Sequence, residues 1–220
     1  MDGTIIVGQC RIPAWANAEH LGCGLARLPA ALHPEINRYH RLGDRLARLT
    51  ARLLTRKTLQ ALGLSRESTL DDWHKTPQGR PFIRNSCVDI SISHTHLWVV
   101  SAVGVKCRVG IDVEIFRPFE FDVLIPYLTA VEIELIRKAA RPEVEALHCW
   151  SKREAILKAD GRGLLVSDAT IRDITAVRTP AGKAWRVKRL EFSDGCLYLA
   201  GDGDIDSLCR KEWSFKELLC

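Results

Sequence analysis

Residues 88–115 carry an almost continuous β-strand pattern, which is the strongest constraint that the sequence places on the fold. Asp89-Ile-Ser-Ile-Ser93 alternates polar and apolar residues, the period of a half-buried strand. Residues 97–105 are apolar and rich in β-branched side chains, and a basic turn at 106–108 separates them from a new strand that begins at Val109. A fold must therefore place several adjacent strands in the middle of this chain.

Helical periodicity lies on both sides of this β stretch. Leucines recur at positions 42, 46, 49 and 53, with spacings of four, three and four, so residues 35–62 predict a long helix. Residues 129–139 and 143–159 predict two more helices, separated by Arg141-Pro142. Residues 73–84 contain two prolines and a glycine and are expected to be loop. Further strands are expected at 4–7, 169–178, 184–192 and 195–200. Each half then has a long helix and several strands, which indicates an α+β fold divided into residues 1–106 and 107–220.

The bulk composition is that of an ordinary globular protein. The chain has 220 residues, of which 46% are hydrophobic, and a formal net charge of +5 that mildly favours anionic partners. Eight cysteines occur without any CxxC pair, so zinc knuckles and thioredoxin-like sites have no support. No stretch predicts a signal peptide or a membrane span. We expect a reduced, cytoplasmic protein whose cysteines are mostly core residues.

Two acids share one face of the strand that begins at Val109. Residues i and i+2 of a strand point the same way, so Asp112 and Glu114 lie together while Ile111 and Val113 face the core. Neighbouring carboxylates repel each other, and a hard cation such as Mg²⁺ removes that cost. A strand edge with its acids in water explains the pair equally simply.

The segment Trp150-Ser-Lys-Arg-Glu-Ala-Ile-Leu-Lys158 places three functional candidates on one helix stripe. Trp150, Glu154 and Lys158 lie at successive i+4 positions. Glu154 suits a third metal ligand or a general base, and Lys158 suits a phosphate contact. A plain surface ion pair between the two is the alternative interpretation.

Basic and polar residues upstream suggest anion binding. Six arginines recur every three or four residues at positions 38, 41, 45, 48, 52 and 56, which suits either phosphate partners or a solvated helix face. Ser93 and His94 close the alternating strand and are candidates for hydrogen bonds to an anionic ligand. A structural histidine, or a zinc ligand in His94-Thr-His96, remains an alternative.

In order and spacing, these motifs resemble the 4′-phosphopantetheinyl transferases. The resemblance rests on Gly110-Ile-Asp-Val-Glu114 together with Trp150–Lys158 and Gly161-Arg-Gly-Leu164. It extends to Gln78-Gly-Arg-Pro-Phe82, to Ile92-Ser-His94 and to the tail from Trp213. The chain length and the layout in two halves resemble those of the surfactin-synthetase-activating type. This resemblance implies a pseudo-dimer of two similar α+β halves with the active site in the cleft between them.

The resemblance also implies roles for individual residues. Asp112, Glu114 and Glu154 match magnesium-binding carboxylates, with Mn²⁺ as an alternative ion. Lys158 matches a lysine on the coenzyme A pyrophosphate. The other matches to coenzyme-A-binding positions are Arg48, Arg80, Ser93 and His94, with Arg80 on the side of the adenosine 3′-phosphate. Arg153 stands where Lys is usual.

The implied reaction transfers phosphopantetheine from coenzyme A to a serine of an apo acyl or peptidyl carrier protein and releases 3′,5′-ADP. Glu154 is the candidate base, directly or through a metal-bound water, and Lys158 assists the leaving group. The carrier would dock near residues 116–128, where apolar side chains lie beside Arg117. Family analogy implies a monomer with no nucleic-acid or membrane partner.

Two other functions fit the same residues. A metal-dependent phosphodiesterase or nuclease would use the same carboxylates and the basic helix. A non-catalytic protein would use the arginine face to bind an acidic partner. The pathway of the carrier (fatty acid, polyketide, nonribosomal peptide or lysine) and tolerance for acylated coenzyme A stay open.

Overall fold

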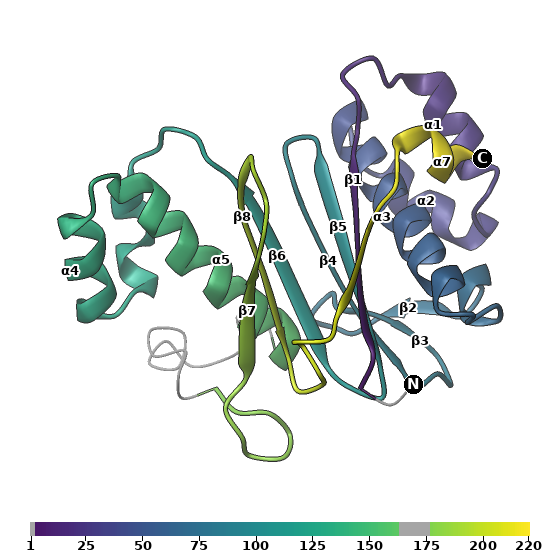
Figure 1. The fold of residues 1–220 in the computed structure, drawn as a ribbon. Helices are drawn as coiled ribbons and strands as arrows, with labels where there is room; N and C mark the ends of the chain where they lie inside the picture. The colour runs from purple at the N-terminus through teal and green to yellow at the C-terminus, as the bar shows by residue number, and fades with distance from the viewer. Residues whose placement is uncertain (1–2, 163–176) are drawn as a thin grey trace.

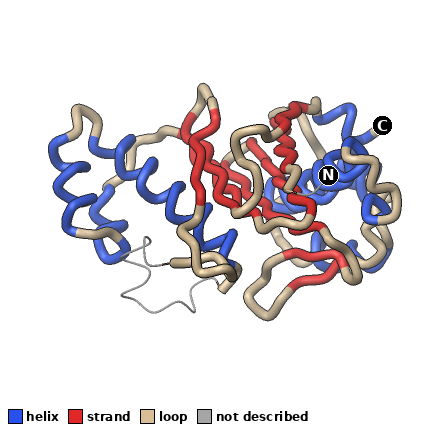
Figure 2. Tube along the Cα trace, turned by 60° about the horizontal axis from the view of Figure 1, so that its bottom comes forward, coloured by secondary structure: helices blue, strands red, loops and turns tan. Residues whose placement is uncertain are grey.

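Two β-sheets lie next to each other in the centre of the molecule, with helices on their outer faces (Figures 1 and 2). The computed structural model describes residues 3–162 and 177–220. This arrangement confirms the expected α+β class. The motif residues Gly163 and Leu164 lie outside the described residues. So do residues 169–176 of the strand expected at 169–178.

The first sheet has the strand order β4-β5-β1-β9. Strand β5 (Trp98–Val105) runs antiparallel to both β4 (Val88–Thr95) and β1 (Ile5–Arg11). Strand β9 (Cys209–Glu212) pairs with β1 in parallel. The outer face of this sheet is covered by α3 (Leu42–Ala61), whose buried leucines form one core with the apolar residues of β4 and β5.

Shorter elements surround α3. The helices are α1 (Ala18–Leu25), α2 (His33–Asn37) and α7 (Phe215–Leu219), with 3₁₀ turns at Ala30–Leu32 and Glu67–Thr69. A two-stranded hairpin of β2 (Trp73–Lys75) and β3 (Pro81–Ile83) precedes β4.

The second sheet has the order β6-β8-β7, with every pair antiparallel. Its strands are β6 (Val109–Ile115), β8 (Gly195–Gly201) and β7 (Arg186–Leu190). Helix α5 (Pro142–Asp160) covers its outer face, and α4 (Ala130–Lys138) and a 3₁₀ segment at Phe121–Tyr127 lie beside α5.

The inner faces of the two sheets share one apolar core. Ile5 and Val7 of β1 and Val100 of β5 pack with Ile111 and Val113 of β6. Gly110 lies on the opposite face of β6, and a Cβ there would overlap the backbone of α5 at Ala155 and Ala159. Asp112 shares the Gly110 face. The predicted orientation of the acids relative to Ile111 and Val113 is therefore confirmed.

The two sheets have the same topology. Each is built from a strand, a long helix and two more strands, in the spatial order first, last, middle: β1-α3-β4-β5 and β6-α5-β7-β8. Whether the halves form a pseudo-dimer stays a prediction, as does the division at residue 106. The segment from β9 to α7 lies against the first sheet and α3, although it follows the second sheet in sequence.

Several local expectations were wrong. The loop expected at 73–84 contains the β2–β3 hairpin. The helix expected at 35–62 begins only at Leu42, after the separate short helix α2. All eight cysteines are free. Most of them were expected in the core, but four are exposed: Cys23, Cys87, Cys209 and Cys220.

Candidate active site

Strands β4 and β6 lie side by side and are joined through β4 side chains that alternate along the strand. Val109 donates its backbone N–H to Asp89 Oδ2 (2.8 Å), and Ile111 donates its own to Ser91 Oγ (3.0 Å). Further along, the Ser93 hydroxyl donates to Asp112 Oδ1 at 2.8 Å. Because side chains i and i+2 share a face, the alternating sequence Asp-Ile-Ser-Ile-Ser supplies this whole row. This row of contacts places Ser93 of strand β4 against Asp112 of strand β6.

Asp112 is the central charged residue of the contacts between β4, β6 and α5. Its residue is 3% exposed, and its Oδ1 accepts hydrogen bonds from Ser93 Oγ and from Lys158 Nζ (2.6 Å). Lys158 Nζ also donates to Ser93 Oγ at 3.0 Å. Asp112 Oδ2 is buried and has no hydrogen-bond partner among the described residues. A buried carboxylate oxygen without a donor costs free energy, so this atom is a candidate ligand atom for a cation.

Helix α5 positions Glu154 and Lys158 because it lies directly on Gly110. The Ser151 hydroxyl donates to the backbone carbonyl of Asp112 (3.2 Å), and Ala155 and Ala159 contact the strand one and two turns later. Glu154 and Lys158 immediately precede these contact positions and line the adjoining cleft. The small residues of the motif therefore set the helix on the strand, and the charged residues face the cleft.

Burial and nearby negative charge raise the pKa of both Glu114 and Glu154. Burial, and then the charge of Asp112, raises the pKa of Glu114, whose Oε2 accepts a hydrogen bond from the Thr95 hydroxyl (3.3 Å). Burial also raises the pKa of Glu154, with Lys158 opposing the effect and Asp112 adding to it. A carboxylate with a raised pKa is a better proton acceptor near neutral pH.

The cleft consists of two adjoining pockets that share Gly79, Pro81, Ile92 and Lys158. The first, of about 250 Å³, has an apolar floor of Ile90, Ile92 and Leu157 and carries Glu154 on its wall. The second, of about 260 Å³, is strongly basic. Its charged and polar lining residues are Arg48, Arg52, Lys75, Ser93, His94 and Lys158.

Of the six arginines spaced along the sequence, two line the basic pocket. Arg38 and Arg41 precede the first residue of α3. Arg52 is buried, donates to Glu35 Oε1 (2.7 Å) and lies over the Trp73 ring. Arg48 lies over the Tyr39 ring. The stripe is thus neither one solvated face nor one anion site.

His94 lies at the open side of the basic pocket. Removal from water, and then the charges of Arg48 and Lys158, lower the pKa of its imidazole. His94 is therefore a neutral hydrogen-bonding group near neutral pH, in a pocket whose positive charge comes from its neighbours.

Comparison with known proteins agrees with this geometry. Residues 108–204, which include Asp112, Glu114, Glu154 and Lys158, match the family model of the 4′-phosphopantetheinyl transferase superfamily. This match covers just under half of the chain and shows that this part is similar to the 4′-phosphopantetheinyl transferase superfamily.

Two relatives carry names from the same superfamily. A Haemophilus influenzae protein provisionally named as a 4′-phosphopantetheinyl transferase is 31% identical over 123 residues, which cover 54% of this chain and 52% of the relative. The 4′-phosphopantetheinyl transferase psf-1 of Bacillus pumilus is 34% identical over 89 residues, 39% of this chain and 38% of the relative. The matches span about half, or less, of the length of these curated relatives.

The structure does not bring the three superfamily carboxylates together as one group. In the part of the chain that the structure describes, no three His, Cys, Asp or Glu side chains lie close enough to hold a metal ion. Lys158 occupies one oxygen of Asp112, and the other oxygen is without a donor. The chemistry of Asp112 Oδ2 fits a hard divalent cation. The full metal set of Asp112, Glu114 and Glu154 stays a prediction.

The segment expected to dock a carrier has an inner and an outer side. Phe119, Phe121 and Leu124 pack inward against Leu128 and Ile136. The outer side exposes a different apolar set on the 3₁₀ segment and α4: Val123, Tyr127, Val131 and Leu135. Phe119, Phe121 and Leu124 are therefore structural residues.

Other contributors to the site have weaker signals in the sequence. Lys75 and Trp73 lie in a segment expected to be loop, yet both line the basic pocket. Asp89 accepts a hydrogen bond from Arg80, and Arg108 donates to the backbone at the end of α5. Neither Asp89 nor Arg108 was a candidate site residue in the sequence. In residues 3–162 and 177–220, no helix combines the length and apolar character needed to cross a bilayer.

Proposed function

We propose that this protein is a 4′-phosphopantetheinyl transferase of the surfactin-synthetase-activating type that uses coenzyme A and an apo carrier protein. The carrier serine Oγ attacks the β-phosphorus of coenzyme A and forms a new P–O bond. The bond from that phosphorus to the bridging oxygen breaks, and 3′,5′-ADP leaves with the electron pair. The serine proton passes to a base.

The observation that carries this proposal is the junction of Lys158, Asp112 and Ser93 beside the cleft, which Lys158 and Ser93 line. It brings a cation, an anion and a hydroxyl from three elements within hydrogen-bond distance. Two of these three residues lie in the segment that matches the superfamily. A cation here would contact a pyrophosphate oxygen and offset charge that develops on the leaving group.

Each residue would have a separate task. Arg48, Ser93 and His94 line the basic pocket, where phosphate oxygens would bind. Glu154 lies on the wall of the adjoining pocket, and burial raises its pKa, which suits the proton acceptor. Asp112, with Glu114 and Glu154 as further candidates, would hold Mg²⁺ or Mn²⁺, which would neutralise pyrophosphate charge.

The carrier would dock near residues 116–128. The exposed Val123 and Tyr127 lie on this segment, and Arg117 is also exposed. Tyr127 contacts the Trp150 ring edge to face, with centroids 5.6 Å apart, so this surface is connected to α5 one turn before Glu154. An acidic carrier with an apolar patch would match such a surface.

The test is incubation of the purified protein with coenzyme A, Mg²⁺ and apo carriers from the fatty acid, polyketide, nonribosomal peptide and lysine pathways. Intact-mass spectrometry should show a gain of one phosphopantetheine group on at least one carrier, and none when its acceptor serine is replaced by alanine. No gain with any of the four classes would contradict the proposal. Cleavage of nucleic acid under the same conditions would instead support a nuclease.

A further inference from the structure

Three alternate residues in and just before strand β6 contact helix α5. Gly110 admits the helix backbone, and Asp112 binds Lys158. Arg108 lies two residues before Gly110, and its side chain also reaches α5. Arg108 is not among the described residues that line the two pockets of the cleft, so its contacts with α5 need an explanation other than ligand binding.

The guanidinium of Arg108 caps the C-terminal end of α5. Its Nη2 donates to the backbone carbonyls of Ala159 and Asp160, both at 2.9 Å, and its Nε donates to the Ala159 carbonyl at 3.2 Å. The last four carbonyls of a helix have no partner within the helix, and a positive charge is favourable at this end of the helix dipole. Arg108 therefore satisfies two of these carbonyls and supplies the favourable charge.

Arg108 is itself held by both β-sheets. Its backbone N–H donates to Asp202 Oδ1 (2.6 Å) at the end of β8, and its Nε lies 3.6 Å from Asp89 Oδ2 on β4. Asp89 is fixed in turn, because its Oδ2 accepts the backbone N–H of Val109 at 2.8 Å. Gly161 ends α5 at φ +84°, and a Cβ there would lie only 2.6 Å from the Arg108 Nη2. The guanidinium and the helix end are thus in close contact, and the sheets set the position of both.

The capped turn is the one that carries Lys158. Lys158 immediately precedes Ala159, and its Nζ donates to Asp112 Oδ1 (2.6 Å) and to Ser93 Oγ (3.0 Å). The ends of helices fray first, and a side chain on a frayed turn shares the disorder of its backbone. The contacts of Arg108 with the next two carbonyls along the chain therefore limit where the Lys158 ammonium can lie.

We infer that Arg108 is a positioning residue that holds Lys158 in the cleft by capping the last turn of α5. This inference rests on the proposed function, in which Lys158 offsets charge on the leaving group. Arg108 touches neither the nucleotide nor the carrier in this role and acts through the helix backbone. A displacement of about 1 Å at a reacting centre can cost about 10²-fold in rate, so loss of the cap should appear mainly in kcat.

Amide hydrogen exchange of the protein without ligands tests the cap by itself. Arg108→Ala should speed exchange at residues 158–161 by about tenfold and leave the first turns of α5 unchanged, because only the last turn frays. Arg162→Ala is the matched control: Arg162 lies at the same helix end, but its 58% exposed side chain pairs with the Asp160 carboxylate. This control should change exchange by less than about twofold, because exposed ion pairs contribute little. Unchanged exchange in Arg108→Ala would overturn the inference.

Transfer kinetics then test whether the cap acts through Lys158. Arg108→Ala should lower kcat by about 10- to 100-fold with little change in the KM for coenzyme A. Arg108→Lys should recover part of this loss, because a cation returns to the helix end. Lys158→Gln keeps a hydrogen-bond donor but removes the charge. In that background, Arg108→Ala should lower kcat by less than about twofold, since the charge that Arg108 positions is already gone.

Each remaining outcome decides one part of the inference. An equal loss of kcat from Arg108→Ala in both backgrounds would show a purely structural role and overturn the positioning role. Where the double variant does not fold, a raised KM with unchanged kcat in Arg108→Ala would overturn it instead. If the unsubstituted protein transfers nothing to any carrier, the proposed function fails, whereas hydrogen exchange still decides whether Arg108 caps α5.

Discussion

The ammonium of Lys158 lies 2.6 Å from Oδ1 of Asp112, and this ion pair joins helix α5 to strand β6 at the wall of the cleft. Both residues also contact Ser93 of strand β4. Lys158 therefore pairs with Asp112 in the fold and, in the proposed reaction, would also contact a phosphate. The first prediction follows from this double role.

Replacing Lys158 should affect both folding and turnover. Lys158→Ala leaves Asp112 buried without its cation, so the free energy of unfolding should fall by about 3 kcal/mol. Turnover should fall by about 10²- to 10³-fold, because charge on the leaving group loses its stabilisation. Lys158→Arg should recover most of the stability in urea unfolding. Wild-type turnover in folded Lys158→Ala would contradict the catalytic role.

A methyl group at Gly110 should separate α5 from the strand. A Cβ there overlaps the Ala155 carbonyl and the Ala159 backbone nitrogen, neither of which can move without the helix. Gly110→Ala should therefore lower the free energy of unfolding by about 1–3 kcal/mol or more in urea titration. Gly22→Ala is the control, because nothing lies within 4 Å of its added Cβ in helix α1. That variant should gain about 0.5–1 kcal/mol. Equal stability of the two variants would show that α5 does not rest on Gly110.

Activity and stability should depend on pH in opposite directions. Burial raises the pKa of Glu154, so as a base it loses activity when pH falls through that raised pKa. A carboxyl whose pKa is higher in the folded state binds its proton more tightly there. Its contribution to stability is therefore present at low pH and is lost as pH rises from the unfolded pKa through the folded one. The pH–rate profile of kcat should show an acidic limb that is absent from the residual activity of Glu154→Gln.

Glu114 offers a second test of the same electrostatics. Burial and the charge of Asp112 raise its pKa, whereas Thr95 can donate to an amide oxygen as well as to a carboxylate. Glu114→Gln should therefore leave the apo protein equally or more stable at pH 7, and flatten the decline of stability with rising pH. A clear loss of stability in this variant would mean that the carboxylate has a stronger favourable partner in the fold than Thr95.

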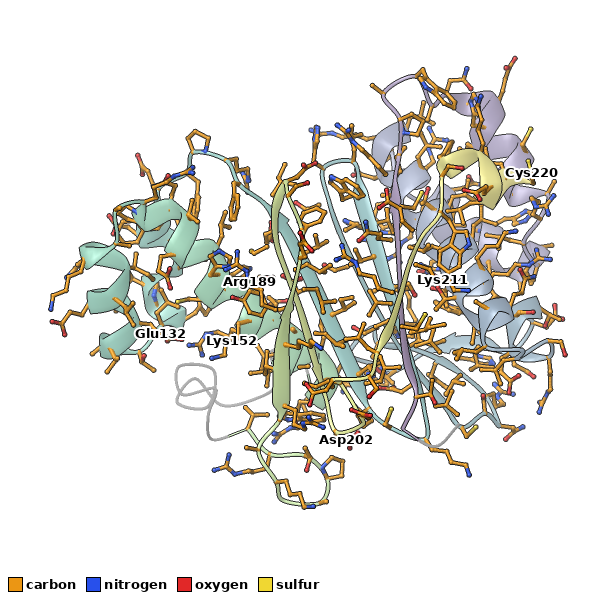
Figure 3. All side chains as sticks on the ribbon, viewed as in Figure 1. Glu132, Lys152, Arg189, Asp202, Lys211 and Cys220 are labelled. Carbon is orange, nitrogen blue, oxygen red and sulfur yellow. The ribbon has the colours of Figure 1, made fainter. Side chains whose placement is uncertain are left out.

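Arg153 is expected to be structural. Its side chain is 1% exposed, and its Nη2 donates to Glu132 Oε2 at 2.5 Å, which ties α5 to the capping box at the start of α4; Glu132 is labelled in Figure 3. Arg153→Lys keeps the charge but loses the planar guanidinium, so stability should fall by about 1–2 kcal/mol with little change in coenzyme A affinity. A changed affinity with unchanged stability would place Arg153 in the site instead.

The sequence predicts this architecture well where one period dominates. The alternation in β4 and the run through β6 indicate both strands and the side on which Asp112 points. The sequence fails at the β2–β3 hairpin, because its strands are three residues long and lie between turn residues. It also fails at β9, whose partner β1 lies about two hundred residues earlier.

The site was predictable as a set of residues, not as a set of contacts. Spacing identifies Glu154 and Lys158 as neighbours, but the Lys158–Asp112 pair depends on how closely α5 approaches Gly110. The six arginines illustrate the same limit. Arg52 forms an ion pair with Glu35, a residue on another helix, whereas Arg48 has no carboxylate partner among the described residues. Nothing in their shared spacing distinguishes the two arginines.

Phosphopantetheine transfer is tested most directly by the ratio of two products in one reaction. After incubation with coenzyme A, Mg²⁺ and an apo carrier, the amount of carrier that has gained phosphopantetheine is measured by intact mass, and released 3′,5′-ADP by chromatography. Transfer predicts equal amounts of both products, and neither with Asp112→Ala. Release of 3′,5′-ADP without any gain in carrier mass would show hydrolysis of coenzyme A and contradict transfer.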